Sequence, residues 1–151
     1  MRIPVTTLND GYDFPLLGLG TYKLTGDEVE TIVRTAIELG YRHIDTAALY
    51  DNEVEVGKAI NNAIKAGDVT REELFVTTKL WDDAHAFDDA IAACEASLER
   101  LGLDYVDLYQ CHRFDQHRPV RGGSRRHPRG RRLPGARLRL GGGHAAVHRL
   151  G

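Results

Sequence analysis

Four polar side chains lie at the predicted ends of buried strands or in the loop beyond one of them, and together they are suited to moving a proton. Asp45, Lys79 and His112 end or directly follow three successive strands, and Tyr50 lies in the loop beyond Asp45. In a repeating strand–helix protein the carboxyl ends of the parallel strands meet at one edge, where chemistry is usually placed. We therefore expect these four residues to form one constellation.

The residue types define the chemistry. An ammonium beside a phenol stabilises the phenolate, and a carboxylate paired with that ammonium keeps it charged and oriented. A histidine across the pocket can hold a substrate oxygen, so the set suits proton transfer to a carbonyl oxygen while hydride reaches the carbonyl carbon. Each residue also has a plainer interpretation: Asp45 as a loop cap, Lys79 as a solvated strand end, Tyr50 as a packing residue. Their joint placement favours the catalytic interpretation. Trp81, just past Lys79, is either a wall of the pocket or a packing anchor.

The elements that must position these residues follow from the apolar pattern. An N-terminal hairpin is predicted around the turn Asn9-Asp10-Gly11, because Asn/Asp-Gly provides the positive φ of tight turns. Strands are predicted at 16–19, 43–45, 74–79 and 105–112, and helices at about 27–39, 53–66 and 87–101, with glycines as stops. Thr70 to Glu73 has the spacing of a capping box.

The strand centres recur at the length of one strand–helix unit. They lie near Leu17, Ile44, Val76 and Leu108, at separations of 27, 32 and 32 residues. Alternating strands and helices predict a parallel sheet with right-handed crossovers. The first turn lacks a G-x-G-x-x-G fingerprint, which argues against a Rossmann dinucleotide site.

Charge divides the chain into two parts. The whole chain of 151 residues has a net charge of −2. Residues 113–151 contain 11 arginines, no lysine and one acid, a net charge of +10, which leaves 9 basic and 21 acidic residues, a net charge of −12, in residues 1–112. We expect the second part to be an irregular Arg/Gly/Pro-rich tail.

Targeting and redox signals are weak. The N-terminus lacks the apolar run of a signal peptide and no segment has the ~20 apolar residues of a membrane span, so we expect a cytoplasmic protein without membrane contact. The 2 cysteines, Cys94 and Cys111, have no CxxC spacing, so neither a disulfide framework nor a metal site is expected.

The motifs resemble those of the aldo-keto reductases over residues 3–112. The run Gly-Tyr-Arg-His-Ile-Asp-Thr-Ala from Gly40, followed by Glu53 and Gly57, closely resembles the first signature of that family. The runs at 17–22, 77–81 and 107–109, with His112, match the family's order and spacing. The diketogluconate and aldose reductase branch is the most similar.

The resemblance implies a (β/α)8 TIM barrel, here an N-terminal hairpin with four strands and three helices, and NADPH-dependent reduction of small aldehydes and ketones. It makes Tyr50 the proton donor, with Lys79 and Asp45 tuning it and His112 orienting the carbonyl. The residues implied to line the nicotinamide end of NADPH are Gly20, Thr21, Tyr22 and Asp45. Those implied to surround the substrate are Tyr50, Trp81 and His112.

The resemblance changes after His112. Its neighbours Gln110-Cys111 and Arg113-Phe114 differ from the aliphatic pair and the Trp-Pro that the family usually carries. The motifs of the family's second half are missing from the tail. Arginine without lysine, with many glycines and prolines, is typical of GC-rich DNA read out of frame, and we hold a frameshift as a hypothesis for residues 113–151.

Two other hypotheses take the tail at face value. In one, its arginines bind nucleic acid or another polyanion, although no aromatic residue beyond Phe114 could stack on bases. In the other, the tail covers the acidic part of the chain. Because four strands cannot close an eight-stranded barrel, we also expect poor folding or self-association through exposed edge strands, and little or no turnover by this chain alone.

Overall fold

The structure is a computed structural model that describes residues 3–81, 87–112 and 146–148. Its centre is a five-stranded sheet in the order β3-β4-β5-β6-β7. The strands are β3 (Leu19–Gly20), β4 (His43–Asp45), β5 (Phe75–Leu80), β6 (Leu108–Cys111) and β7 (Ala146–His148). The first four are parallel and β7 is antiparallel to β6. This is the partial α/β barrel that the sequence predicts.

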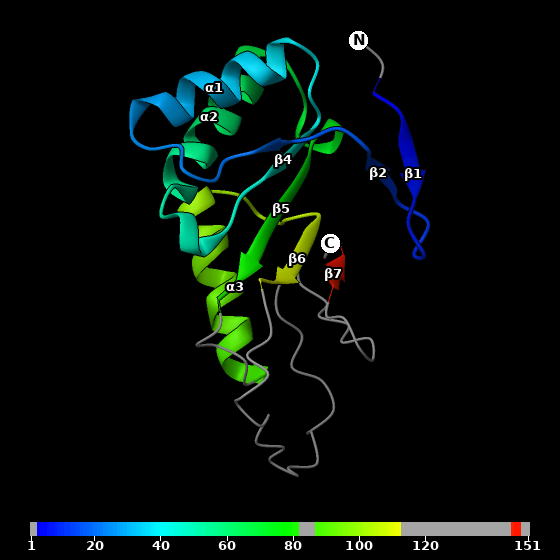
Figure 1. The fold of residues 1–151 in the computed structure, drawn as a ribbon, viewed down its shortest axis with the longest axis vertical. Helices are drawn as coiled ribbons and strands as arrows, with labels where there is room; N and C mark the ends of the chain where they lie inside the picture. The colour runs from blue at the N-terminus through cyan, green and yellow to red at the C-terminus, as the bar shows by residue number, and fades with distance from the viewer. Residues whose placement is uncertain (1–2, 82–86, 113–145, 149–151) are drawn as a thin grey trace.

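Three helices cover one face of this sheet (Figure 1). They are α1 (Asp27–Glu38), α2 (Glu53–Ala66) and α3 (Phe87–Leu101). Short 3-10 helices, η1 (Ala48–Tyr50) and η2 (Arg71–Glu73), precede α2 and β5. The capping box of Thr70 and Glu73 forms as predicted.

The core lies between the sheet and the helices. The fully buried side chains Val33, Ile44, Ile60 and Val76 come from α1, β4, α2 and β5, as the 3.6-residue and 2-residue periods predict. The helices α2 and α3 approach closely at Gly57, where an added Cβ would lie 2.0 Å from the Leu101 carbonyl oxygen. A glycine is therefore needed at this crossing.

The hairpin lies on the other side of the sheet from the helices (Figure 1). It pairs β1 (Val5–Thr7) with β2 (Asp13–Pro15), antiparallel, around the predicted turn. The Phe14 ring contacts the rings of His43 and Phe75, the first residues of β4 and β5. The hairpin thus packs near the amino ends of the parallel strands.

Two elements differ from the predicted ones. Only Leu19 of the apolar run at 16–19 joins the sheet, followed there by Gly20, and Leu16 is 60% exposed, because the chain before Leu19 leads out of the hairpin. Residues 146–148, in the tail expected to be irregular, form β7 on the otherwise open edge of β6. A strand edge offers unpaired backbone groups to such a segment. The hypotheses on residues 113–145 lie outside the described residues.

Candidate active site

Asp45 and Lys79 meet at the carboxyl ends of two neighbouring strands. Asp45 ends β4 and lies in register with Thr77 of β5, so Lys79 projects from the same face of the sheet one step further along. The Lys79 Nζ donates to Asp45 Oδ1 at 2.5 Å and to the Thr46 carbonyl at 2.9 Å. The ammonium is largely shielded, with 13% of the Lys79 side chain exposed against 32% for Asp45. The carboxylate therefore holds a mostly buried charge in a fixed place.

Tyr50 reaches the same ammonium from the loop after β4. The short helix η1 carries it, and Asp51 then adopts a left-handed φ of 53° that redirects the chain into α2. The Lys79 Nζ lies 3.4 Å from the Tyr50 hydroxyl and 5.1 Å from the centre of its ring. The ammonium is thus close enough to donate one hydrogen bond to the phenol oxygen.

Aromatic rings surround the Tyr50 phenol. The rings of Tyr50 and His112 pack edge to face with centroids 5.6 Å apart, and those of His112 and Trp81 do the same at 5.5 Å. On the other side the Tyr22 ring lies 5.0 Å from Tyr50. The His112 backbone N–H donates to the Leu80 carbonyl, which extends the β6 pairing to the histidine. The four residues expected to act together are therefore neighbours in the structure.

The residues expected at the nicotinamide end also lie at this edge, in different surroundings. Gly20 pairs with Asp45 and has open space where a Cβ would be. Tyr22 is 61% exposed, whereas Thr21 is fully buried and its hydroxyl donates inward to Asn52. An approaching group would therefore meet the Gly20 backbone and the Tyr22 ring rather than the Thr21 side chain.

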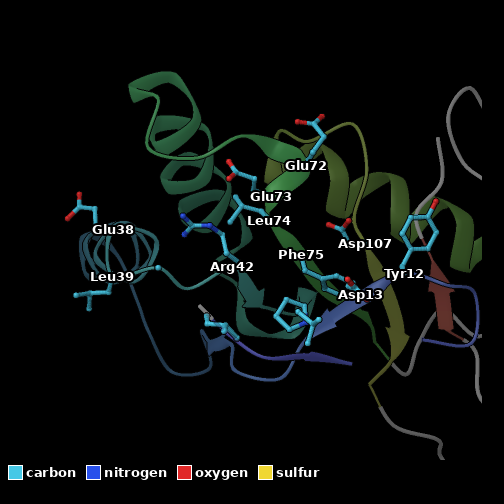
Figure 2. A pocket seen from close by; sticks show the side chains of 14 residues that line it. Tyr12, Asp13, Glu38, Leu39, Arg42, Glu72, Glu73, Leu74, Phe75 and Asp107 are labelled. Carbon is cyan, nitrogen blue, oxygen red and sulfur yellow. The ribbon is translucent and has the colours of Figure 1, made fainter. Parts of the chain in front are cut away.

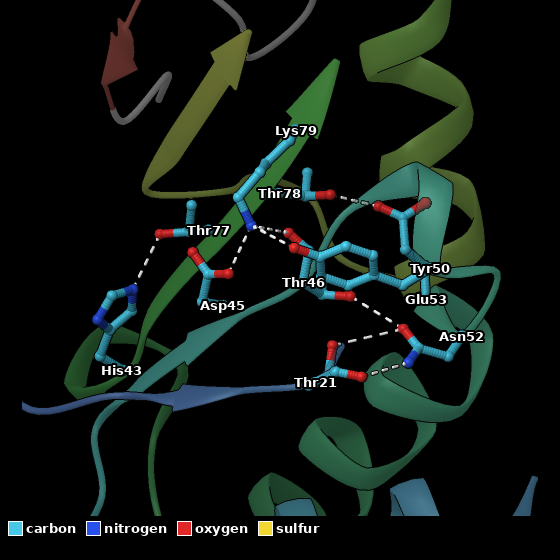
Figure 3. Close-up of polar contacts among 10 residues, drawn as sticks. All are labelled: Thr21, His43, Asp45, Thr46, Tyr50, Asn52, Glu53, Thr77, Thr78 and Lys79. Atoms are coloured by element: carbon cyan, nitrogen blue, oxygen red, sulfur yellow. Dashed lines mark hydrogen bonds and ion pairs between the residues drawn. The ribbon is translucent and has the colours of Figure 1, made fainter. Parts of the chain in front are cut away.

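Behind the site lie two buried polar residues, Asn52 and Glu53, which the sequence places at the start of a helix, with Glu53 also part of the family signature. Glu53 is 2% exposed, and its carboxylate accepts from the Thr78 hydroxyl at 2.5 Å and from Arg100 Nε at 2.7 Å. Asn52 is equally buried and bonds to the loops after β3 and β4 (Figure 3). Apart from the signature that includes Glu53, their sequence signal was their place directly after the loop that carries Tyr50.

A second inward-facing layer of side chains lies next to the site, nearer the amino ends of the strands. His43 of β4 precedes Asp45 by two residues, and its Nε2 is 3.0 Å from the Thr77 hydroxyl. Burial lowers the pKa of His43 from its ordinary value, so its imidazole is neutral at pH 7. Burial also raises the pKa of the Cys94 thiol, to about 11, which keeps that core thiol protonated.

A cavity of about 640 Å³ lies at the opposite end of the strands, between the hairpin and the segments that lead into β4, β5 and β6 (Figure 2). Its walls include Tyr12, Asp13, Arg42, Phe75 and Asp107 and none of the four clustered residues. The candidate site therefore rests on its charged and aromatic side chains, not on this cavity. Within the described residues, no group of acidic, histidine and cysteine side chains could hold a metal ion, and no helix could cross a membrane.

Comparison with known proteins identifies the architecture and then the family. A crystal structure of a Bombyx mori aldo-keto reductase in complex with NADP superposes with a TM-score of 0.68 at 51% identity, covering 72% of this chain and 38% of the other. The model of the aldo/keto reductase family matches residues 16–128. The chain belongs to the aldo/keto reductase family.

Curated relatives agree with this assignment. An aldo-keto reductase of Bombyx mori is 53% identical over 118 residues, 74% of this chain and 38% of the relative. An NADP-dependent D-sorbitol-6-phosphate dehydrogenase of Malus domestica is 48% identical over 106 residues, 70% of this chain and 34% of the relative. An aldo-keto reductase of Mycolicibacterium paratuberculosis is 55% identical over 109 residues, 72% and 37% of the two chains. The chain thus spans little more than a third of the length of these relatives.

Proposed function

We propose that this site serves the NADPH-dependent reduction of an aldehyde or ketone to an alcohol. The observation that carries the proposal is the position of the Lys79 ammonium, which contacts both the Asp45 carboxylate and the Tyr50 hydroxyl. A lysine held by a carboxylate is a fixed positive charge. Placed beside a phenol, it stabilises the phenolate left after proton donation.

Each residue then has a defined part. Tyr50 donates its hydroxyl proton to the carbonyl oxygen as the carbonyl carbon gains a hydride, and the phenolate later regains a proton from water. Lys79 stabilises that phenolate, and Asp45 holds the ammonium in place. His112, whose ring packs against Tyr50, orients the carbonyl oxygen toward the phenol. Trp81 and Tyr22 restrict water around the reacting carbonyl.

The residues present fit the nicotinamide end of NADPH. A flat ring with a polar carboxamide suits the open space over Gly20, the exposed Tyr22 ring and the partly exposed Asp45 carboxylate. The Bombyx mori relative crystallised with NADP and the NADP-dependent Malus domestica relative support this choice. NADPH, when bound, supplies the hydride.

The test is a titration of NADPH fluorescence with the whole chain, followed by an assay of NADPH oxidation with an added aldehyde. We expect NADPH binding and aldehyde-dependent oxidation that is very slow, in keeping with the little turnover expected of four strands that cannot close an eight-stranded barrel. The variant Lys79→Met should bind NADPH and lose the oxidation, because the phenolate is no longer stabilised. Equal rates in both proteins, or no aldehyde-dependent oxidation by the unchanged chain, would contradict the proposed function.

A further inference from the structure

Asn52 occupies a helix-capping position without capping the helix. It is the N-cap residue of α2, a place where asparagine is strongly preferred because its side chain can accept from the first backbone N–H groups. Here the side chain makes no such bond, and the residue is only 2% exposed. The hydrogen bonds of its amide therefore serve something other than the start of α2.

The amide instead joins two loops at the edge of the candidate site (Figure 3). Its Oδ1 accepts from the hydroxyls of Thr46, at 3.1 Å, and Thr21, at 3.4 Å. Its Nδ2 donates to the carbonyls of Thr21, at 2.9 Å, and Leu24, at 3.0 Å. These four bonds use both donors and both lone pairs of a side-chain amide. A fully satisfied buried group of this kind holds its partners in one arrangement.

Thr46 connects this amide to the lysine. Its hydroxyl donates to Asn52, its carbonyl accepts from Lys79 Nζ at 2.9 Å, and its N–H donates to the Thr77 carbonyl at 2.9 Å. A rotation of the Thr46 peptide would move the carbonyl that, with Asp45, holds the ammonium. A change in the bond between Thr46 and Asn52 would therefore reach Lys79 through the Thr46 carbonyl.

Asn52 also fixes the chain on the Tyr50 side of the contact between the Lys79 ammonium and the Tyr50 hydroxyl. Tyr50 precedes Asn52 by two residues, so the chain that carries the phenol is fixed directly behind it. We propose that Asn52 is a positioning residue, which sets the separation of the Lys79 ammonium and the Tyr50 hydroxyl through Thr46. The proposal deepens the proposed reductase function and rests on it. Asn52 itself touches neither the substrate nor the reacting atoms.

The decisive variants change one hydroxyl. Thr46→Val removes only the group that contacts Asn52 and keeps the size of the side chain, whereas Thr46→Ser retains the hydroxyl. The readout is the 13Cζ resonance of Tyr50, assigned by its loss in Tyr50→Phe, with Lys79→Met as the reference for a phenol without its ammonium. We expect Thr46→Val to move the resonance toward that reference and Thr46→Ser to leave it in place.

Asn52→Ala and Asn62→Ala form a matched pair on α2. Asn62 donates to Glu30 at 2.8 Å, on the α1 side and away from the site. We expect Asn52→Ala to move the Tyr50 resonance further than Thr46→Val does, and Asn62→Ala to leave it unchanged. Where turnover is measurable, kcat should fall about 100-fold in Asn52→Ala and about 10-fold in Thr46→Val with KM nearly constant, because small misplacements cost rate.

The resonance separates this proposal from the proposed function. Absence of turnover in the unchanged chain would remove the reductase function, and the Tyr50 signal would still decide whether Asn52 positions the pair. An unchanged signal in Thr46→Val would overturn the positioning role. Equal shifts in Thr46→Val and Thr46→Ser, or in Asn52→Ala and Asn62→Ala, would also overturn it, since they would indicate general loosening.

Discussion

The two ends of the same strands carry different kinds of inward-facing pair. Near the amino ends His43 and Thr77 form a neutral, buried pair, with the rings of Phe14 and Phe75 against the imidazole. Two residues further along each strand, Asp45 and Lys79 form a charged pair that remains partly exposed. The 2-residue period of a strand places both pairs on one face, so a structural layer directly supports a reactive one.

The supporting networks differ in the same way. Near the amino ends Arg71 donates to the Asp107 carboxylate and to the carbonyls of Leu74 and Tyr105, and its guanidinium lies 3.9 Å from the centre of the Tyr105 ring. These contacts join segments that lead into β5 and β6. Asn52 and Glu53 bond instead to segments beside Tyr50 and Lys79. Changes at the amino ends should therefore affect stability alone, and those at the carboxyl ends should also affect the reaction.

The sharpest test compares one phenol at each end. Tyr50→Phe removes the proposed proton donor while keeping the ring that packs on Tyr22 and His112. Where turnover is measurable, we expect kcat to fall by about 100-fold or more, the usual contribution of a positioned acid. Tyr12→Phe, on the wall of the cavity beside the hairpin, is the matched control and should keep the rate. Similar losses in both variants would end the functional distinction between the two ends.

A second test compares one arginine at each end. Arg71→Met should lower the free energy of unfolding by about 3 kcal/mol, because it leaves the buried Asp107 carboxylate without its cation. Arg100→Met should cost less, about 2 kcal/mol, because the Arg100 side chain is 40% exposed although the Glu53 side chain is only 1% exposed. Urea denaturation measures both.

The same variants then separate the two roles. In folded protein, Arg71→Met should leave the Tyr50 resonance in place. Arg100→Met should move it, because Glu53 also holds the Thr78 hydroxyl directly before Lys79. A shifted signal in Arg71→Met, or none in Arg100→Met, would show that support is not divided between the ends of the strands.

Local patterns predicted much of this arrangement. The helix from Phe87 to Leu101 has the bounds that its apolar spacing indicates, and His43–Asp45 is the predicted strand. The cluster of Asp45, Lys79 and His112 followed from one rule, that parallel strands end at one edge. Sequence reasoning succeeds here because each residue's place depends on its own strand and on the regular repeat of strands.

Other features depend on contacts between distant segments. A polar pair at a helix start is typical of a solvated cap, so nothing local predicts that Asn52 and Glu53 are buried, with partners up to 47 residues away. The pairing of residues 146–148 with β6 likewise depends on an available edge rather than on a strong strand pattern. The roles of these residues are visible only in the folded structure, because they depend on burial and on contacts with distant segments and not on residue type.

The smallest expected effect tests the structural layer by pH. Burial holds the pKa of His43 below its ordinary value. The negative charges of Asp45 and Asp107 raise this pKa, whereas the positive charge of Lys79 lowers it further. As pH falls below about 6.5 the unfolded chain takes up a proton that the folded chain does not, so this contribution to stability is complete above that pH and is lost below it. His43→Gln, whose amide can still form a hydrogen bond with the Thr77 hydroxyl, should flatten this part of the stability curve measured by urea denaturation.

The comparison must be made as a difference between the two proteins, since the chain has 7 histidines and the other 6 titrate in both. Subtracting the His43→Gln curve from that of the unchanged chain isolates His43. If His43→Gln loses less free energy of unfolding than the unchanged chain as pH falls, the imidazole next to the reactive pair is neutral in the folded protein. A difference independent of pH would mean that His43 titrates equally when folded and unfolded. The Phe14 ring would then not shield the imidazole from water, and the pair of His43 and Thr77 would not be a water-free layer that supports Asp45 and Lys79.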